Sequence, residues 1–186
     1  KTFLRLSQNL SPHLEWRGAP EETQSFALVC IDAHAPATKP PYVNTPGTLI
    51  PAKYPRGEFV HWLMVDVPAS VSQLAEGSCS RAVIPGGKRI PAGPDGSRQG
   101  LNDYTHWFAG DKDMEGPYLG YDGPCPPFND SIPHHYAFTL FALDVPTLPV
   151  TGHFTLAALR EALKGHVLAE ATLVGRYTTN PDIRLK

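Results

Sequence analysis

The sequence has few cysteines, no long apolar run and no excess of charge of either sign. Its three cysteines, Cys30, Cys79 and Cys125, lack the spacing of a disulfide scaffold or of a structural zinc site. No apolar run is long enough to span a bilayer, so stable membrane insertion is not expected. The formal net charge of -2 is small, and it argues against nucleic acid or an anionic membrane as a partner.

The length and the proline content indicate the class of protein. A chain of 186 residues suits a single domain over residues 1–186, which can bury a core without disulfides or metals. Proline occurs 20 times, about twice its usual frequency, which favours loops and short strands over helices. No signal peptide is evident, so the expected compartment is the cytoplasm. Because the chain starts at Lys1 without Met, a processed N-terminus leaves the periplasm open.

Three apolar segments are predicted to be central strands of one sheet. They are Ser25–Ile31, Phe59–Val67 and Tyr136–Asp144, each rich in aromatic or β-branched residues and bounded by turn residues. Alternation along the second segment predicts two faces. One face would carry His61, Leu63 and Val65, and the other would carry Trp62, Met64 and Asp66.

The segments between these strands are predicted to be mostly irregular. Ala37–Glu58 has neither a helical nor a strand period, and its many prolines predict a loop outside the core, either a lid or surface padding. Val71–Ala75 is predicted to be one helical turn, and Asn102–Phe108 a short aromatic strand or turn.

One helix is predicted near the C-terminus. Thr155 is the expected N-cap, apolar residues follow at helical spacing, and Gly165 is the expected stop. After a further helical turn, Ala171–Thr178 is predicted to return to the sheet as a strand.

Chemically active side chains occur where these strands begin or end. Asp32 ends the first strand, where a half-buried carboxylate is costly without partners; capping the turn before Pro36 is the alternative role. The stiff loop Gly-Tyr-Asp-Gly-Pro-Cys-Pro-Pro and a short polar turn lead into the third strand. Alternation there places His134 and Tyr136 on one face and His135 on the other.

These stretches carry a resemblance to a known family. DAHAP (32–36), HWLMVDVP (61–68) and GPCPPFNDSIPHHYAFTLFALD (123–144) are similar to the signatures of the phosphatidylethanolamine-binding protein (PEBP) family, in its bacterial and archaeal YbhB/YbcL-like branch. The resemblance covers nearly the whole chain. It implies a mainly β fold, a PEBP-like β-sandwich or Greek-key sheet with short helices near the C-terminus. His34 departs from the family pattern, because it replaces the usual second acid of the first signature.

The resemblance also implies a pocket for a small anion, meaning phosphate, a phosphoryl headgroup or a carboxylate. Its residues would be Asp32, His61, His134 and Tyr136, with the loop around Gly123 and Cys125 as a wall that offers a backbone donor. Two imidazoles and a phenol can each donate to an oxyanion, and Asp32 would fix a tautomer or keep one imidazole charged. The expected function is therefore non-enzymatic binding, with a regulatory role as one option and with no cofactor and no bound metal.

Two other functions stay open. Asp32, His61 and His134 have the composition of a metal site or an acid–base set. Against an enzyme, no nucleophile motif accompanies them, and Cys125 lies between prolines without an evident base. Alternatively, Ala37–Glu58 could be the epitope of an interaction or inhibitor module. A homodimer is also left open.

Overall fold

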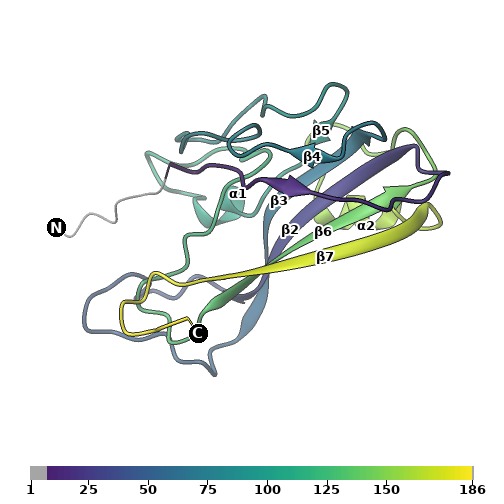
Figure 1. Cartoon of the computed structure of the whole chain (residues 1–186). Helices are drawn as coiled ribbons and strands as arrows, with labels where there is room; N and C mark the ends of the chain where they lie inside the picture. The colour runs from purple at the N-terminus through teal and green to yellow at the C-terminus, as the bar shows by residue number, and fades with distance from the viewer. Residues whose placement is uncertain (1–7, 186) are drawn as a thin grey trace.

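The computed structural model describes residues 8–185, and an antiparallel five-stranded sheet forms its centre (Figure 1). The strand order across the sheet is β5-β3-β2-β6-β7. The strands are β5 (Arg98–Gln99), β3 (Arg56–Pro68), β2 (Ser25–Pro36), β6 (His134–Leu143) and β7 (Val167–Tyr177). The three predicted central strands are thus confirmed as β2, β3 and β6, which lie side by side in the middle of one sheet.

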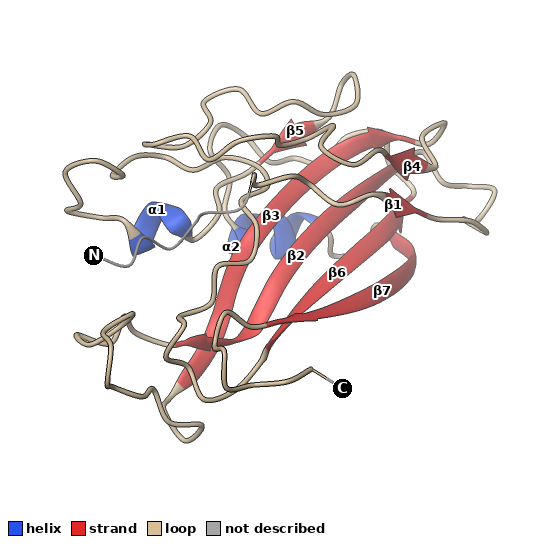
Figure 2. Ribbon diagram, turned by 60° about the vertical axis from the view of Figure 1, so that its left-hand side comes forward, coloured by secondary structure: helices blue, strands red, loops and turns tan. Residues whose placement is uncertain are grey.

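Small elements cover the two faces of this sheet (Figure 2). A two-stranded sheet of β1 (Leu14–Glu15) and β4 (Gln73–Leu74) lies over one face. Helix α2 (Leu156–Ala162) lies over the other. The Thr155 side chain accepts a hydrogen bond from the Ala158 amide, as predicted for an N-cap. No helix in residues 8–185 is both long and apolar enough to cross a membrane.

Each face of the sheet has its own apolar core. The β1/β4-side core includes Phe26, Leu28 and Trp62, and the α2-side core includes Leu63, Val65 and Leu159. Side chains of successive residues in a strand point to opposite faces, so β2 and β3 supply both cores. Strands buried on both faces explain the nearly continuous apolar runs of these two segments.

Several local predictions are wrong. Residues 73–74 form strand β4, and Tyr104–Trp107 form the short helix α1. Strand β7 starts at Val167, and its residues are exposed along their whole length. The loop between β2 and β3 starts at Ala37 as predicted but ends earlier than predicted, because β3 starts at Arg56. Ile50 within that loop is completely buried, so the segment does not lie wholly outside the core.

The predicted faces of β3 are confirmed for Leu63 and Val65 against Trp62 and Met64, but they are wrong for His61 and Asp66, because the strand contains bulges. Cys30 pairs with Trp62 and Ile31 with Val60, so His61 is an extra residue in β3. The centroid of the His61 ring lies 5.1 Å from that of the Tyr136 ring. Tyr136 and Trp62 both belong to the core on the β1/β4 side of the sheet. His61 and Trp62 therefore share a face. A second irregularity, with Asp66 at φ 58°, turns Asp66 toward the amide of Leu148 on the α2 side.

Candidate functional site

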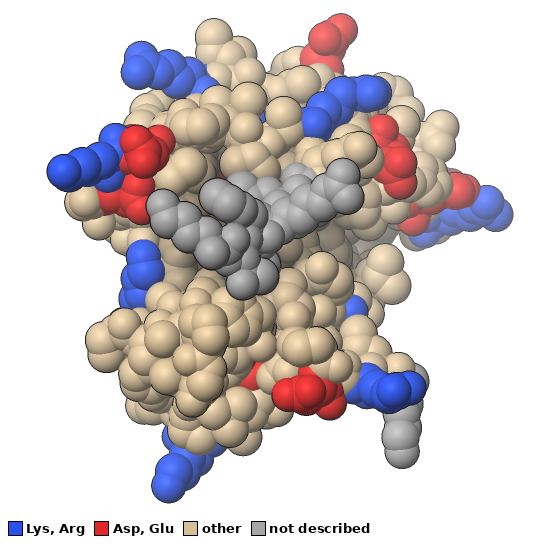
Figure 3. Space-filling model, turned by 90° about the vertical axis from the view of Figure 1, so that its left-hand side faces the viewer, with Lys and Arg blue, Asp and Glu red and all other residues tan. Residues whose placement is uncertain are grey.

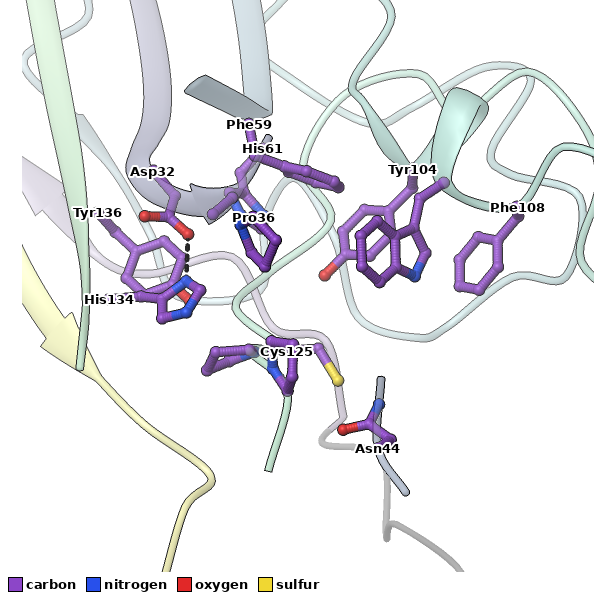
Figure 4. A pocket seen from close by; sticks show the side chains of 14 residues that line it. Asp32, Pro36, Asn44, Phe59, His61, Tyr104, Phe108, Cys125, His134 and Tyr136 are labelled. Carbon is purple, nitrogen blue, oxygen red and sulfur yellow. Dashed lines mark hydrogen bonds and ion pairs between the residues drawn. The ribbon is translucent and has the colours of Figure 1, made fainter. Parts of the chain in front are cut away.

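A cavity of about 190 Å³ opens where β2, β3 and β6 meet the loops at their ends (Figure 4). Polar side chains lie at one end of it and aromatic rings at the other. Five of its polar lining residues are Asp32, Asn44, His61, His134 and Tyr136. The other lining residues are Ala35, Pro36, Phe59, Tyr104, Trp107, Phe108, Cys125, Pro126 and Pro127.

His134, the first residue of β6, lies between two carboxylates. Its Nδ1 is 2.5 Å from Asp32 Oδ2, and its Nε2 is 3.2 Å from Asp130 Oδ2. Carboxylates only accept hydrogen bonds, so both ring nitrogens donate when the imidazole is charged. Burial lowers the pKa of His134, but the bonds to Asp130 and Asp32 outweigh it, and the net shift is upward. Neither ring nitrogen is left free for a ligand.

Arg56, at the start of β3, completes this buried network. Its guanidinium forms two hydrogen bonds to Asp130, at 2.5 and 3.0 Å. Burial raises the pKa of Asp130, but the bonds from His134 and Arg56 outweigh it, so the carboxyl pKa is lowered. Two carboxylates, one imidazolium and one guanidinium sum to zero charge. No net charge is therefore buried, and removing any one member would leave an uncompensated charge in the core.

His61 has a different protonation state from His134. Its Nδ1 lies 2.7 Å from the carbonyl oxygen of Asp122, which can only accept, so Nδ1 carries the proton. Burial lowers the pKa of His61 more than that bond and the nearby carboxylates raise it. The ring is therefore neutral near pH 7, and Nε2 presents a lone pair. Nε2 makes no hydrogen bond within residues 8–185 that would use this lone pair.

Cys125 and Gly123, both in the loop before β6, have different relations to the cavity. Cys125 lines the cavity, and burial raises the pKa of its thiol, so it is not a thiolate near neutral pH. Gly123 is not a lining residue. Its amide donates to Asn9 Oδ1 at 2.8 Å, and its carbonyl accepts from the Tyr104 hydroxyl at 2.8 Å. The Gly123 amide is thus already engaged.

Four aromatic rings form the far wall of the cavity. They come from β3 and from the segment around α1, and they are Phe59, Tyr104, Trp107 and Phe108. The Phe59 ring meets those of Tyr104 and Trp107 edge to face, with centroids 5.0 and 6.0 Å apart. This wall offers apolar surface next to the polar end (Figure 4).

The loop between β2 and β3 is fastened to the turn that carries Asp130. The Ile50 amide donates to the carbonyl of Asn129, and the Ser131 amide donates to the carbonyl of Ile50. Asn44 accepts from the Phe128 amide through its side chain, at 2.8 Å. The loop is therefore held against the turn before β6, and it contributes Asn44 to the lining of the cavity.

Sequence analysis missed several residues of this site. Asp130 was part of a turn described only as polar, Arg56 was assigned to a loop, and the rings around α1 lacked a motif. The sequence does contain an acid four residues before His134, but its burial, which makes a partner necessary, is seen only in the structure. Of the residues implied by the resemblance, only Gly123 lies outside the lining of the cavity.

The surroundings of the site provide no strong electric field. Basic and acidic side chains are scattered around the face shown in Figure 3, without a patch of one sign. Within residues 8–185, no group of three or more His, Cys, Asp or Glu side chains is arranged to hold a metal ion. The lining of the cavity therefore offers local hydrogen-bonding groups and rings rather than a field of one sign.

Comparison with known proteins places the chain among its relatives. The family model described as phosphatidylethanolamine-binding protein matches residues 3–178. A UPF0098 protein of Methanothermobacter thermautotrophicus is 34% identical over 91% of this chain and 83% of its own length. The crystal structure of Escherichia coli YbcL, described as a member of the mammalian PEBP family, matches with a TM-score of 0.64 and 29% identity. That match covers 91% of this chain and 80% of YbcL. A PEBP homologue from Chlamydia trachomatis matches with a TM-score of 0.59 and 30% identity, over 90% and 80% of the two chains.

Proposed function

The chain belongs to the phosphatidylethanolamine-binding protein family, and from this membership and its cavity we propose that it binds a small phosphoryl-bearing anion without transforming it. The observation that carries the proposal is the pairing of a buried polar end with an aromatic wall in one cavity. Sites for small molecules combine apolar walls with a few polar groups that fix orientation. A phosphate ester with a short apolar group has both parts, because its phosphoryl group suits the polar end and its apolar group suits the aromatic wall.

The polar end offers defined partners for a phosphoryl group. Burial raises the pKa of Tyr136 far above its ordinary value, so its hydroxyl keeps its proton and can donate. The side-chain amide of Asn44 and the indole of Trp107 also carry N–H donors in the lining. The His134 ring stacks near that of Tyr136, with centroids 6.5 Å apart, but Asp32 and Asp130 balance its charge, so the donors named here must hold the anion.

Titration calorimetry with methyl phosphate tests the proposal. We expect saturable binding that weakens by about tenfold or more in Tyr136→Phe, since a donor to a charged group contributes about 1.5–3 kcal/mol. Tyr177→Phe is the matched control, because it removes the same hydroxyl from an exposed tyrosine on β7. Equal affinity in all three proteins would contradict the proposal. Binding of ethylammonium instead of methyl phosphate would overturn it in favour of a cation site.

An activity screen separates binding from catalysis. The Cys125 thiol is protonated, and His134 has both nitrogens engaged, so neither is an activated nucleophile or a free base. We expect no hydrolysis of aryl phosphates, aryl esters or peptides above the uncatalysed rate. Turnover that disappears in His61→Phe or His134→Gln would establish an enzyme in place of a binding protein.

A further inference from the structure

We infer that His61 accepts a hydrogen bond from the ligand, so that the pocket selects oxyanions that carry their own proton over oxyanions that carry none. The inference rests on the proposed function and deepens it by naming the protonation state of the ligand. It predicts that the monoanion of a phosphate monoester is bound in preference to a sulfate ester of the same size and charge.

The first support is the fixed tautomer of His61. The Asp122 carbonyl, 2.7 Å from Nδ1, fixes the proton on that nitrogen. The Asp122 amide donates at 3.0 Å to the backbone carbonyl of His61, so the two residues are joined twice. A ring held in this way cannot turn its N–H into the cavity without losing the bond to Asp122. Its Nε2 therefore remains an acceptor.

The second support is the neighbourhood of His61 in the cavity. The titratable and charged groups that face it are Asp32 from β2, His134 and Tyr136 from β6, Tyr104 from α1 and Asp122 from the loop before β6. The Asp32 carboxylate accepts bonds from the His34 amide at 2.8 Å and from His134 at 2.5 Å. A fully ionised oxyanion would thus place its lone pairs against the lone pairs of His61 and Asp32.

A ligand with a P–OH group avoids this conflict. Its hydroxyl can donate to His61 Nε2, while its charged oxygens accept from Tyr136 and the other donors in the lining. A buried acceptor that is left without a donor costs about ten- to a hundredfold in affinity. Selectivity of this size arises from one proton on the ligand, with no change in its shape.

Methyl phosphate and methyl sulfate form the matched pair of probes. At about pH 5 the phosphate ester is mainly a monoanion, because its second pKa is about 6, and methyl sulfate is a monoanion without a proton. Calorimetry on the wild-type protein should find methyl phosphate bound at least about tenfold more tightly. This ratio should fall toward one as the pH rises to about 8 and the phosphate ester loses its proton. Taking the ratio cancels protein titrations that affect both anions alike.

A variant identifies the responsible residue. His61→Phe retains a ring against Tyr136 but has no acceptor, so the two esters should bind with similar affinity. His153→Phe, at an exposed position, should leave the ratio unchanged. If His61→Phe does not fold, the wild-type affinity ratio and its dependence on pH still test the inference. Equal affinities in the wild-type protein at about pH 5, or a ratio that does not change with pH, would overturn the inference. Failure of both esters to bind at millimolar concentration would overturn the proposed function and the inference with it.

Discussion

His134 and His135 are neighbours in the chain, yet they occupy opposite faces of the sheet and entirely different surroundings. His134 is buried between Asp32 and Asp130, with both ring nitrogens hydrogen bonded. His135 is partly exposed and packs against His34, with ring centroids 4.6 Å apart. The Nδ1 atoms of His34 and His135 are buried without a hydrogen bond. In this pair, the imidazole whose pKa is raised is the one between two carboxylates, and the pKa of its neighbour is lowered.

The largest expected effect is the loss of stability in His134→Ala. The substitution removes the cation between two buried carboxylates, and uncompensated buried charge costs about 3–5 kcal/mol. Urea unfolding at about pH 6 should find the loss, while His135→Ala should change the free energy of unfolding by no more than about 0.5 kcal/mol. Similar losses in the two variants would mean that the faces of β6 do not differ as described.

Arg56→Met should have the second largest effect, because it removes two hydrogen bonds to Asp130 and two to the carbonyls of His34 and Pro51 but leaves His134 in place. The expected loss is about 2 kcal/mol, the range for hydrogen bonds to a charged group. Arg160→Met is the matched control: Arg160 also makes two hydrogen bonds to a carboxylate, that of Glu58, but at the surface. Solvent screens that pair, so its loss should stay below about 1 kcal/mol. Equal losses would show that burial gives the Asp130 pair no added importance.

The contribution of the network should depend on pH in both directions. The folded pKa of His134 is raised, so its contribution is complete below the unfolded value of about 6.5 and is lost as the pH rises through the folded value. The folded pKa of Asp130 is lowered, so its contribution is present above about 3.9 and is lost as the pH falls through the folded value. The difference in unfolding free energy between wild type and His134→Ala should therefore be largest between about pH 4 and pH 6.5. Urea unfolding at several pH values checks this, and a constant difference would exclude a charged His134.

The sequence was sufficient to predict the three central strands and the helix with its Thr155 cap. Their apolar runs and turn residues are local signals, and local signals are what a single sequence contains. Alternation also separated His134 from His135, because β6 pairs with β7 without a bulge from His134 to Ala142. In β3 the same rule failed for His61 and Asp66, because bulges at these positions move each to the face opposite the predicted one. A bulge depends on the neighbouring strand and is not visible in the pattern of one strand.

The partners of His134 were harder to predict than His134 itself. Asp130 and Arg56 are 74 positions apart in sequence, and their pairing depends on how the loop before β3 folds against the turn before β6. The aromatic wall has the same origin, since α1 is a single short turn without a motif of its own. Residues brought together by loops are set by tertiary contacts, which composition and periodicity do not encode.

The smallest expected effect on stability is that of replacing His135, whose Nδ1 has no hydrogen-bond partner within residues 8–185. Burial and the nearby His34 and Arg176 lower the pKa of His135, so wild-type stability is lost as the pH falls below the unfolded value of about 6.5. His135→Phe keeps a ring against His34 but removes the buried Nδ1 that lacks a partner. We expect a change within about 0.5 kcal/mol near pH 8, and a growing advantage for the variant toward pH 5, measured by thermal and urea unfolding. Methyl phosphate affinity should be unaffected, because His135 is outside the lining of the cavity. A loss above about 1 kcal/mol would instead mean that Nδ1 of His135 makes a stabilising hydrogen bond in solution.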